Sequence, residues 1–262
     1  MSARRIDLNA DLGEGFGPWR MGDDAALLDI VTSANVACGF HAGDPDIMVE
    51  TAAAALAQGV AIGAHPGFHD LRGFGRNRIQ EGPRRLERDI AYQIGALQAC
   101  AALAGARVTH VKAHGALANL SNEDDAVAAA LARAVAGVDR RLVLVVMPGL
   151  AAERAGERAG LALVREIYAD RAYAEDGTLA PRSSPGAVIH DADEAAERVA
   201  RMVGEGAVFT GSGRRLPVAI ETVCVHGDNP AALVMARAVR SRLERAGLSL
   251  RPFAGQDADP EQ

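Results

Sequence analysis

The sequence lacks the features that mark nucleic-acid binders, disulfide-bonded proteins and membrane proteins. Its formal net charge of −6 is opposite in sign to the basic surface that nucleic-acid binding requires. No CxxC pair or zinc-type spacing occurs among Cys38, Cys100 and Cys224, so we expect all three to be reduced, buried and apolar in character. The longest apolar run, 142–152, is far too short to cross a membrane, and the first residues lack a secretory signal. These absences predict a cytoplasmic protein that binds neither nucleic acid nor membrane.

A buried strand, a polar turn and a capped helix follow one another between residues 33 and 46. Asn35–Phe40 is short, apolar and uncharged, which is typical of a strand buried on both faces. Asp44 is placed as the N-cap of a helix that begins at Pro45. His41 therefore lies at the carboxyl end of the strand, which is where α/β folds bind ligands.

The same order of elements recurs along the chain and predicts the fold class. We expect further strands at Ile6–Leu8, Val60–Ala64, Val108–Lys112, Leu142–Val146, Leu161–Val164 and Ala219–Val225. Helices are expected at Pro45–Gln58, Pro83–Leu103, Ala126–Ala136 (after a capping box at 121–124), Asp191–Val203 and Ala231–Ala246. About seven strands alternating with helices in 262 residues favour one β/α barrel domain over 1–253, with a polar tail at 254–262. The alternative is a doubly wound open sheet, but that fold would gather its polar tips near one switch point, whereas here nearly every tip is polar.

Two strand ends carry candidate functional side chains. Asn9, Asp11 and Glu14 fall within six residues after the first strand, although a capped, solvated turn would use the same residues. His65 ends the strand at Val60–Ala64; Pro66 and Gly67 prevent a helix there, so a metal pair with His69 is not expected, and His69 is predicted to be a solvated loop residue.

Lys112 is the most unusual cation in the sequence. It continues an otherwise apolar strand and shares one face of it with His110, close to His114. Burying an unpaired ammonium group is costly, so Lys112 must meet a carboxylate, a phosphate or water.

Two later segments add ionisable groups to the same predicted barrel mouth. Alternation places Glu166, Tyr168 and Asp170 on one side, as the wall of a site, the alternative being an exposed, charged loop. His226 and Asp228 follow the last strand and repeat the pattern seen at His41. The segment 178–188, which contains Arg182, is too rich in proline for a central strand.

These strand ends, taken together, resemble the LamB/YcsF family from about Ile6 to Pro230. The motifs that carry the resemblance are IDLNADLGEGFG, ANVACGFHAGDP, AIGAHPGF with DLRGFGR, HVKAHGAL, EIYADRAY, APRSSPGAVI and VCVHGDNP. The sequence departs from the family pattern at Ala113 and His69, where proline is usual, and at Ala118, where an aromatic residue is usual. The departure at His69 counts against a functional role for that residue.

The resemblance implies both a fold and a reaction. The fold is an irregular seven-stranded β/α barrel, similar to the glycoside hydrolase/deacetylase type. The reaction is the ATP-dependent opening of the lactam 5-oxo-L-proline to L-glutamate, carried out with partner subunits B and C. ATP with Mg²⁺ is the implied cofactor.

The residues at the strand ends suit that reaction in three groups. The cations that face the phosphoryl oxygens would be Lys112, Arg182 and Arg171. The bases or proton shuttles would be His41, His114 and His226. The Mg²⁺ ligands would be Asp11, Glu14 and Asp228. The candidate catalytic residues are thus Asp11, His41, His65, Lys112, His114, Glu166, Asp170, Arg182, His226 and Asp228, and the candidate cofactor-binding residues are Asn9, Glu14, Lys112 and Arg182.

Two other functions stay open on the sequence. One is a metal-dependent, deacetylase-like amide hydrolase with Asp11, His41 and His65 around zinc or another divalent ion. The other is a non-catalytic subunit that only binds the lactam. Because the chain has neither an HxxxH pattern on a helix nor a cysteine cluster, we expect no tightly bound transition metal.

Overall fold

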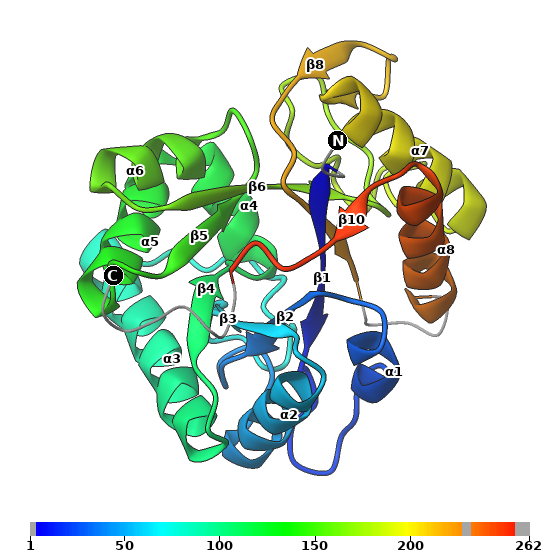
Figure 1. Ribbon diagram of the computed structural model, residues 1–262. Coiled ribbons are helices and arrows are strands. Elements are labelled where there is room, and N and C mark those ends of the chain that lie inside the picture. Colours follow the sequence, from blue (N-terminus) through cyan, green and yellow to red (C-terminus); the bar gives the residue numbers. More distant parts are fainter. Residues whose placement is uncertain (1–3, 227–231, 255–262) are drawn as a thin grey trace.

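Seven parallel strands form a closed barrel in the computed structural model, which describes residues 4–226 and 232–254 (Figure 1). In order around the barrel they are β1 (Arg5–Leu12), β2 (Ser33–Ala37), β3 (Ala61–His65), β4 (Val108–Val111), β5 (Val143–Val146), β6 (Leu163–Tyr168) and β9 (Thr222–Val225). Pairing of β9 with β1 closes the ring, with Asn9 opposite Cys224. Because every pair in the ring is parallel, the carboxyl ends of all seven strands meet at one mouth.

Helices cover the outside of the barrel (Figure 1). They are α1 (Asp24–Leu28), α2 (Pro45–Ala57), α3 (Pro83–Leu103), α4 (Gly115–Glu123), α5 (Asp125–Val138), α6 (Ala151–Ala159), α7 (Ala192–Glu205) and α8 (Ala232–Arg245). A short antiparallel hairpin of β7 (Ala207–Phe209) and β8 (Arg215–Pro217) lies beside α7. The two-residue strand β10 (Ser249–Leu250) pairs in parallel with the first residues of β1. Within the described ranges, no helix is both long enough and apolar enough to span a membrane.

Local sequence explains where α2 begins and which face of α3 is buried. The Asp44 carboxylate accepts a hydrogen bond from the Ile47 amide, and Pro45 occupies the first helical position, so α2 begins where the sequence predicts. Along α3, Ile90, Ile94 and Leu97 form one fully buried stripe against the barrel. Such apolar contacts hold the outer layer in place.

The predicted fold class is confirmed, and the closed ring rules out the open, doubly wound sheet. Several strand boundaries were wrong. β1 continues to Leu12, so Asn9 and Asp11 lie within the strand and not after it, and β9 begins at Thr222 and not at Ala219. β2 ends at Ala37 and not at Phe40, because Gly39 (φ 96°) and Gly43 (φ 81°) turn the chain there and the Gly39 amide bonds to the Ala42 carbonyl. β6 continues to Tyr168, beyond the predicted end at Val164, which carries its polar residues into the barrel mouth.

The predicted capping box at 121–124 was also wrong. Ser121 lies inside α4, where its hydroxyl donates to the Ala118 carbonyl. Asp124 alone caps α5, accepting from the amides of Ala126 and Val127. α1, α4, α6, the β7–β8 hairpin and β10 were not predicted; all of them are short. Residues 255–262 of the predicted polar tail lie outside the described residues.

The barrel interior below the mouth is a polar network and not an apolar plug. Asp7 accepts hydrogen bonds from Thr32, Ser33 and Thr222, and burial raises its pKa to about 6 despite these bonds. Above it, the Asn9 amide donates to Glu166 and Thr222 at 3.0 and 2.7 Å. These side chains come from different strands, so their hydrogen bonds fix the strands relative to one another.

A close contact between β3 and β4 gives a stability prediction. A Cβ atom at Gly63 would lie 2.1 Å from the His110 ring, which is itself buried and bonded to Asn35. Gly63→Ala should therefore lower the free energy of unfolding by about 1–3 kcal/mol through overpacking. Gly95→Ala is the matched control, because Gly95 lies in α3 with open space around it, and it should be neutral or stabilising by up to about 1 kcal/mol. Urea unfolding measures both; equal stability of the two variants would contradict the packing described here.

Candidate active site

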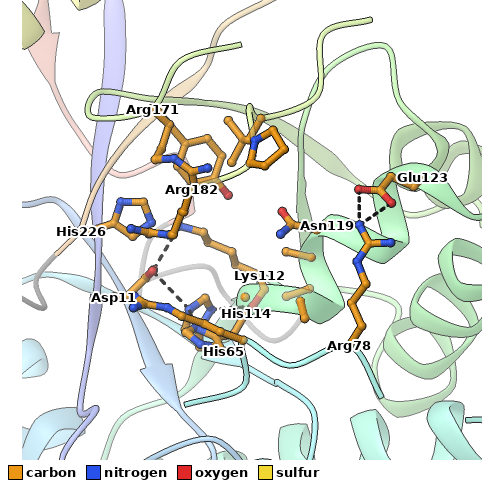
Figure 2. Close-up of a pocket in the computed structure, with 18 of the residues that line it drawn as sticks. Asp11, His65, Arg78, Lys112, His114, Asn119, Glu123, Arg171, Arg182 and His226 are labelled. Atoms are coloured by element: carbon orange, nitrogen blue, oxygen red, sulfur yellow. Dashed lines mark hydrogen bonds and ion pairs between the residues drawn. The ribbon is translucent and has the colours of Figure 1, made fainter. Parts of the chain in front are cut away.

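A cavity of about 380 Å³ opens at the carboxyl ends of the strands (Figure 2). Asp11 reaches it from β1 and His65 from β3, while Lys112 and His114 follow β4 directly. The segments after β6 and β9 contribute Arg171, Arg182 and His226. The barrel mouth therefore collects polar groups from five places in the sequence, as expected for parallel strands.

Lys112 lies at the centre of this mouth and is 3% exposed. Its Nζ atom is 3.1 Å from Asp11 Oδ1 and 3.0 Å from Glu166 Oε1. It also donates to Asn9 Oδ1 at 3.2 Å and to Cys224 Sγ at 3.0 Å. Burial lowers the pKa of Lys112, but these neighbours, Asp11 above all, raise it well above its usual value. Of the three partners that the sequence allowed, the structure therefore shows carboxylates.

Asp11 connects the Lys112 ammonium group to His65 (Figure 2). Its Oδ2 atom lies 3.3 Å from His65 Nε2, while Oδ1 holds Lys112. Burial raises the pKa of Asp11, but His65 and Lys112 together hold it well below its usual value. Both oxygens of this ionised carboxylate are thus in use within the protein.

His226 and Asp170 form a second pair at the mouth. His226 Nδ1 lies 2.8 Å from both carboxylate oxygens of Asp170. Burial lowers the pKa of His226, but Asp170 raises it above its usual value, and the pKa of Asp170 is lowered in turn. A carboxylate that accepts from Nδ1 orients the ring and leaves Nε2 for proton transfer, as in hydrolases with a catalytic triad.

Two arginines bring positive charge to the same cavity. Arg171 is buried, and its guanidinium donates to the carbonyls of Ala180 and Ala187 at 2.6 and 3.4 Å. Burial and the positive charge of Arg182 lower the pKa of Arg171, and Arg182 also lowers the pKa of Asp170. Arg182 itself is exposed. Two guanidinium groups that line the same cavity favour a bound carboxylate or phosphoryl group.

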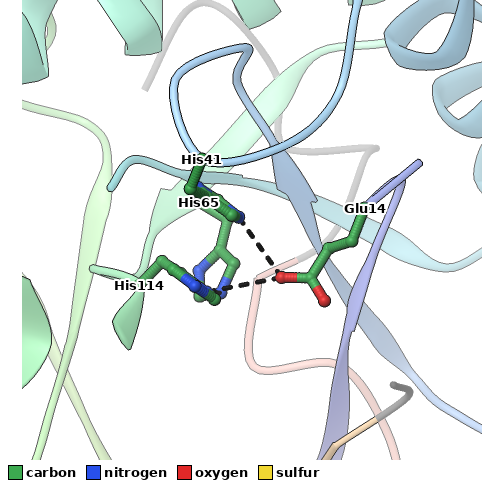
Figure 3. Close-up of side chains that lie close together, drawn as sticks. All are labelled: Glu14, His41, His65 and His114. Atoms are coloured by element: carbon green, nitrogen blue, oxygen red, sulfur yellow. Dashed lines mark hydrogen bonds and ion pairs between the residues drawn. The ribbon is translucent and has the colours of Figure 1, made fainter. Parts of the chain in front are cut away.

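A cluster of three histidines and one glutamate lies beside the cavity (Figure 3). Glu14, His41, His65 and His114 each offer one metal-ligand atom within 4.8 Å of the others. Burial lowers the pKa values of His41 and His114 well below their usual value, so both rings are neutral, which is the state that binds metals. The expectation of no transition metal relied on the absence of a linear ligand pattern. The fold supplies four donors from separate segments, so that reason no longer applies.

The structure thus places most of the predicted site residues around one mouth. Asn9, Asp11, His65, Lys112, His114, Glu166, Asp170, Arg182 and His226 lie at the 380 Å³ cavity or directly beneath it. Glu14 and His41 face a second, more apolar cavity of about 490 Å³, with Phe16 and Trp19. Asp228 lies outside the described residues. His69 is exposed and stacks on Phe40 at 4.6 Å, in line with its prediction as a loop residue.

Cys224 is the main residue that the sequence interpretation missed. It was predicted to be reduced, buried and apolar in character; it is buried as expected, but its sulfur accepts a hydrogen bond from Lys112. Alternation along β9 places Cys224 on the same face as His226, a signal that was available in the sequence. Cys100 is only half-buried, so the prediction of burial was wrong there.

The model of the LamB/YcsF family matches residues 6–258. The chain belongs to this family. A protein of Rhodopseudomonas palustris (strain ATCC BAA-98 / CGA009), named as the A subunit of 5-oxoprolinase, is 57% identical over 252 residues, which are 96% of this chain and 99% of that protein.

Solved structures of two other proteins share the barrel. The crystal structure of a lactam utilization protein from Thermus thermophilus matches with a TM-score of 0.90 and 46% identity, over 95% of this chain and 100% of that one. The catalytic domain of a peptidoglycan N-acetylglucosamine deacetylase from Eubacterium rectale ATCC 33656 matches with a TM-score of 0.53 over 98% of this chain and 91% of that one. At 10% identity, the second match shows a common fold alone. The family and the deacetylase-type barrel are thereby confirmed.

The ion pairs of Lys112 lead to a prediction about stability. Lys112→Met strands two buried carboxylates, so the free energy of unfolding should fall by about 3–5 kcal/mol. Arg78→Met is the matched control, since Arg78 lines the same cavity but pairs with Glu123 at the surface, and its loss should be below about 1 kcal/mol. Denaturant unfolding of both variants checks this. A Lys112 variant as stable as the wild type would show that the cation carries no structural ion pair.

Proposed function

We propose that the chain is the A subunit of an ATP-dependent 5-oxoprolinase in the cytoplasm. With partner subunits B and C, it would convert 5-oxo-L-proline to L-glutamate while ATP is hydrolysed to ADP and phosphate. The observation that carries the proposal is the cavity in which two arginines face Lys112 and His226, in a chain 57% identical to a protein named as the A subunit of 5-oxoprolinase. That cavity, at about 380 Å³, is of a size for a small polar substrate.

The charges of the mouth match the two polar ends of 5-oxoproline. The substrate carboxylate would bind between Arg171 and Arg182, through hydrogen bonds that are charged on both sides. The lactam carbonyl would then point toward Lys112, whose ammonium group is held by Asp11 and Glu166. In this orientation, negative charge that develops on the carbonyl oxygen is stabilised by a cation that is already in place.

A five-membered lactam is an unreactive amide, so its opening needs the activation that ATP can supply. Transfer of the γ-phosphoryl group to the carbonyl oxygen makes the ring carbon electrophilic. One water then adds to that carbon, and the ring C–N bond breaks as the nitrogen takes a proton, leaving an acyl phosphate. A second water releases phosphate and yields glutamate, so the balance is one ATP and two waters for each lactam.

The proposed proton-transfer residue is His226. It lines the cavity, and Asp170 orients its ring. His41 and His114, which the sequence offered for the same role, instead lie in the cluster with Glu14. We therefore assign base catalysis to the His226–Asp170 pair.

The residues of this mouth fit a phosphoryl group better than a whole nucleotide. Lys112, beside the lactam carbonyl, would meet the phosphoryl oxygens, while Arg171 and Arg182 hold the substrate carboxylate. Asp11, expected as a Mg²⁺ ligand, has both oxygens engaged by Lys112 and His65, and Asn9 is bonded beneath the mouth. In the proposal, ATP with Mg²⁺ remains the cofactor of the complex, and the partner subunits contribute the rest of its binding site.

The histidine–glutamate cluster favours a second candidate function, a metal-dependent amide hydrolase. Such an enzyme would open its substrate without ATP, using a metal-bound water. The two functions differ in their requirement for nucleotide and for partner chains, so one assay separates them.

The test is an assay of the chain alone and with co-purified subunits B and C, scored for glutamate and ADP. We expect no appreciable glutamate from the isolated chain and equal amounts of glutamate and ADP from the complex. Arg182→Ala should lower kcat/KM for 5-oxoproline about 10- to 100-fold, since a charged hydrogen bond contributes about 1.5–3 kcal/mol. Arg214→Ala, an exposed arginine next to β8, is the control and should leave the rate unchanged.

Three outcomes of this assay would contradict the proposal. Glutamate formed by the isolated chain without ATP would support the metal-dependent hydrolase. A complex that consumes ATP equally well with or without 5-oxoproline would remove the lactam as substrate. An Arg182→Ala rate equal to that of Arg214→Ala would mean that the substrate lies elsewhere.

A further inference from the structure

Two histidines of the cluster have one ring nitrogen committed to the backbone. His65 Nδ1 lies 2.7 Å from the Lys112 carbonyl oxygen, and His114 Nε2 lies 2.8 Å from the Phe74 carbonyl oxygen. A carbonyl oxygen can only accept, so both of these nitrogens carry the proton and donate. In a neutral imidazole, the other ring nitrogen then carries no proton and has a free lone pair.

Those two bare nitrogens face each other. His65 Nε2 and His114 Nδ1 are 3.0 Å apart in the protein interior, where His65 is 1% and His114 5% exposed. Asp11 Oδ2 also lies 3.3 Å from His65 Nε2, so two nitrogen lone pairs and a carboxylate oxygen converge here. These groups repel one another unless something positive lies among them, which can be a second proton on His65, shared with His114 and Asp11, or a metal ion.

The surrounding groups favour a metal ion. Glu14 Oε1 lies 3.3 Å from His114 Nδ1, so a carboxylate oxygen converges on the same point (Figure 3). Separations of 3.0 and 3.3 Å are those of neighbouring ligands on one ion with bonds of about 2.0–2.1 Å. In metal sites, the ligating histidines commonly donate their other N–H to a backbone carbonyl, as both do here.

His41 has a different position in the cluster. Its ring stacks flat on His114, with centroids 3.7 Å apart and planes 3° from parallel. Lone pairs of parallel rings do not converge on one ion, so His41 cannot ligate together with His114. Its Nε2 lies 3.2 Å from Glu14 Oε1 and holds that carboxylate in place. His41 is thus a positioning residue for Glu14.

We infer that His65 Nε2, His114 Nδ1 and Glu14 Oε1 bind one divalent transition-metal ion of the Zn²⁺ class. Three protein ligands leave at least one coordination position open, as in catalytic rather than structural zinc sites. His65 and His114 line the 380 Å³ cavity, and Glu14 lines the 490 Å³ cavity, so the ion would lie in the wall between the two. There it could polarise a carbonyl oxygen or activate a water. The inference depends only on the cluster and not on the proposed substrate.

The test is metal binding by the purified full chain after treatment with a chelator. Calorimetric titration with Zn²⁺ should give one equivalent with a Kd of about 1 µM or below, and Co²⁺ should give a visible absorption spectrum of nitrogen and oxygen ligation. Glu14→Gln and His114→Gln should abolish stoichiometric binding. His41→Gln should weaken it about 10- to 100-fold, the usual effect of a residue that positions a ligand.

His69→Gln is the matched control, because His69 is exposed and lies outside the cluster; it should bind one equivalent like the wild type. Circular dichroism confirms that each variant is folded. No binding by the folded wild-type chain, or equal binding by Glu14→Gln, would overturn the inference. So would nitrogen NMR showing that His65 and His114 share a proton in the presence of Zn²⁺.

The two proposals can fail independently. A chain that binds one Zn²⁺ but gives no glutamate with its partners would refute the proposed function alone. A chain that binds no metal but supports ATP-coupled glutamate formation would refute the metal site alone.

Discussion

The buried ammonium group of Lys112 is the interaction on which the rest of the barrel mouth depends. It ties β1, β6 and β9 together through Asp11, Glu166 and Cys224, which are far apart in the sequence. None of these charges would be tolerated in the interior alone, so each is stable only because the others are present. Beneath them, the Asn9 amide donates hydrogen bonds to Glu166 and Thr222, so these polar side chains also rely on one another for their hydrogen bonds. Burying polar and charged groups of this kind costs desolvation free energy, and we attribute their presence to a binding site at the mouth.

Asp11 divides that mouth into two halves of different chemistry. One oxygen holds Lys112 on the side of the arginines and His226, where charge favours an anionic substrate. The other oxygen lies 3.3 Å from His65 Nε2, at the edge of the histidine–glutamate cluster. A change in charge on either side therefore acts on the other through one carboxylate. An anion bound near Arg182 and an ion bound at the cluster would therefore be coupled electrostatically through Asp11.

The sequence predicted which residues reach the mouth better than what they do there. Parallel strands must bring their carboxyl ends together, so polar residues after each strand, such as His65, Lys112 and Glu166, could be placed without coordinates. Their partners could not, because contacts between distant strands depend on the barrel's register. The cluster shows this most clearly: the lone pairs of His65 and His114 meet only because the carbonyls of Lys112 and Phe74 set each ring's tautomer. No spacing rule in the chain encodes that.

The central claim is that the arginine-lined mouth of the barrel binds the lactam. A crystal structure of the chain with 5-oxoproline tests it most directly. We expect the substrate carboxylate within hydrogen-bonding distance of Arg171 and Arg182, with the lactam carbonyl turned toward Lys112. A lactam found instead in the apolar cavity beside Phe16 and Trp19, or a mouth that stays empty at saturating ligand, would contradict it.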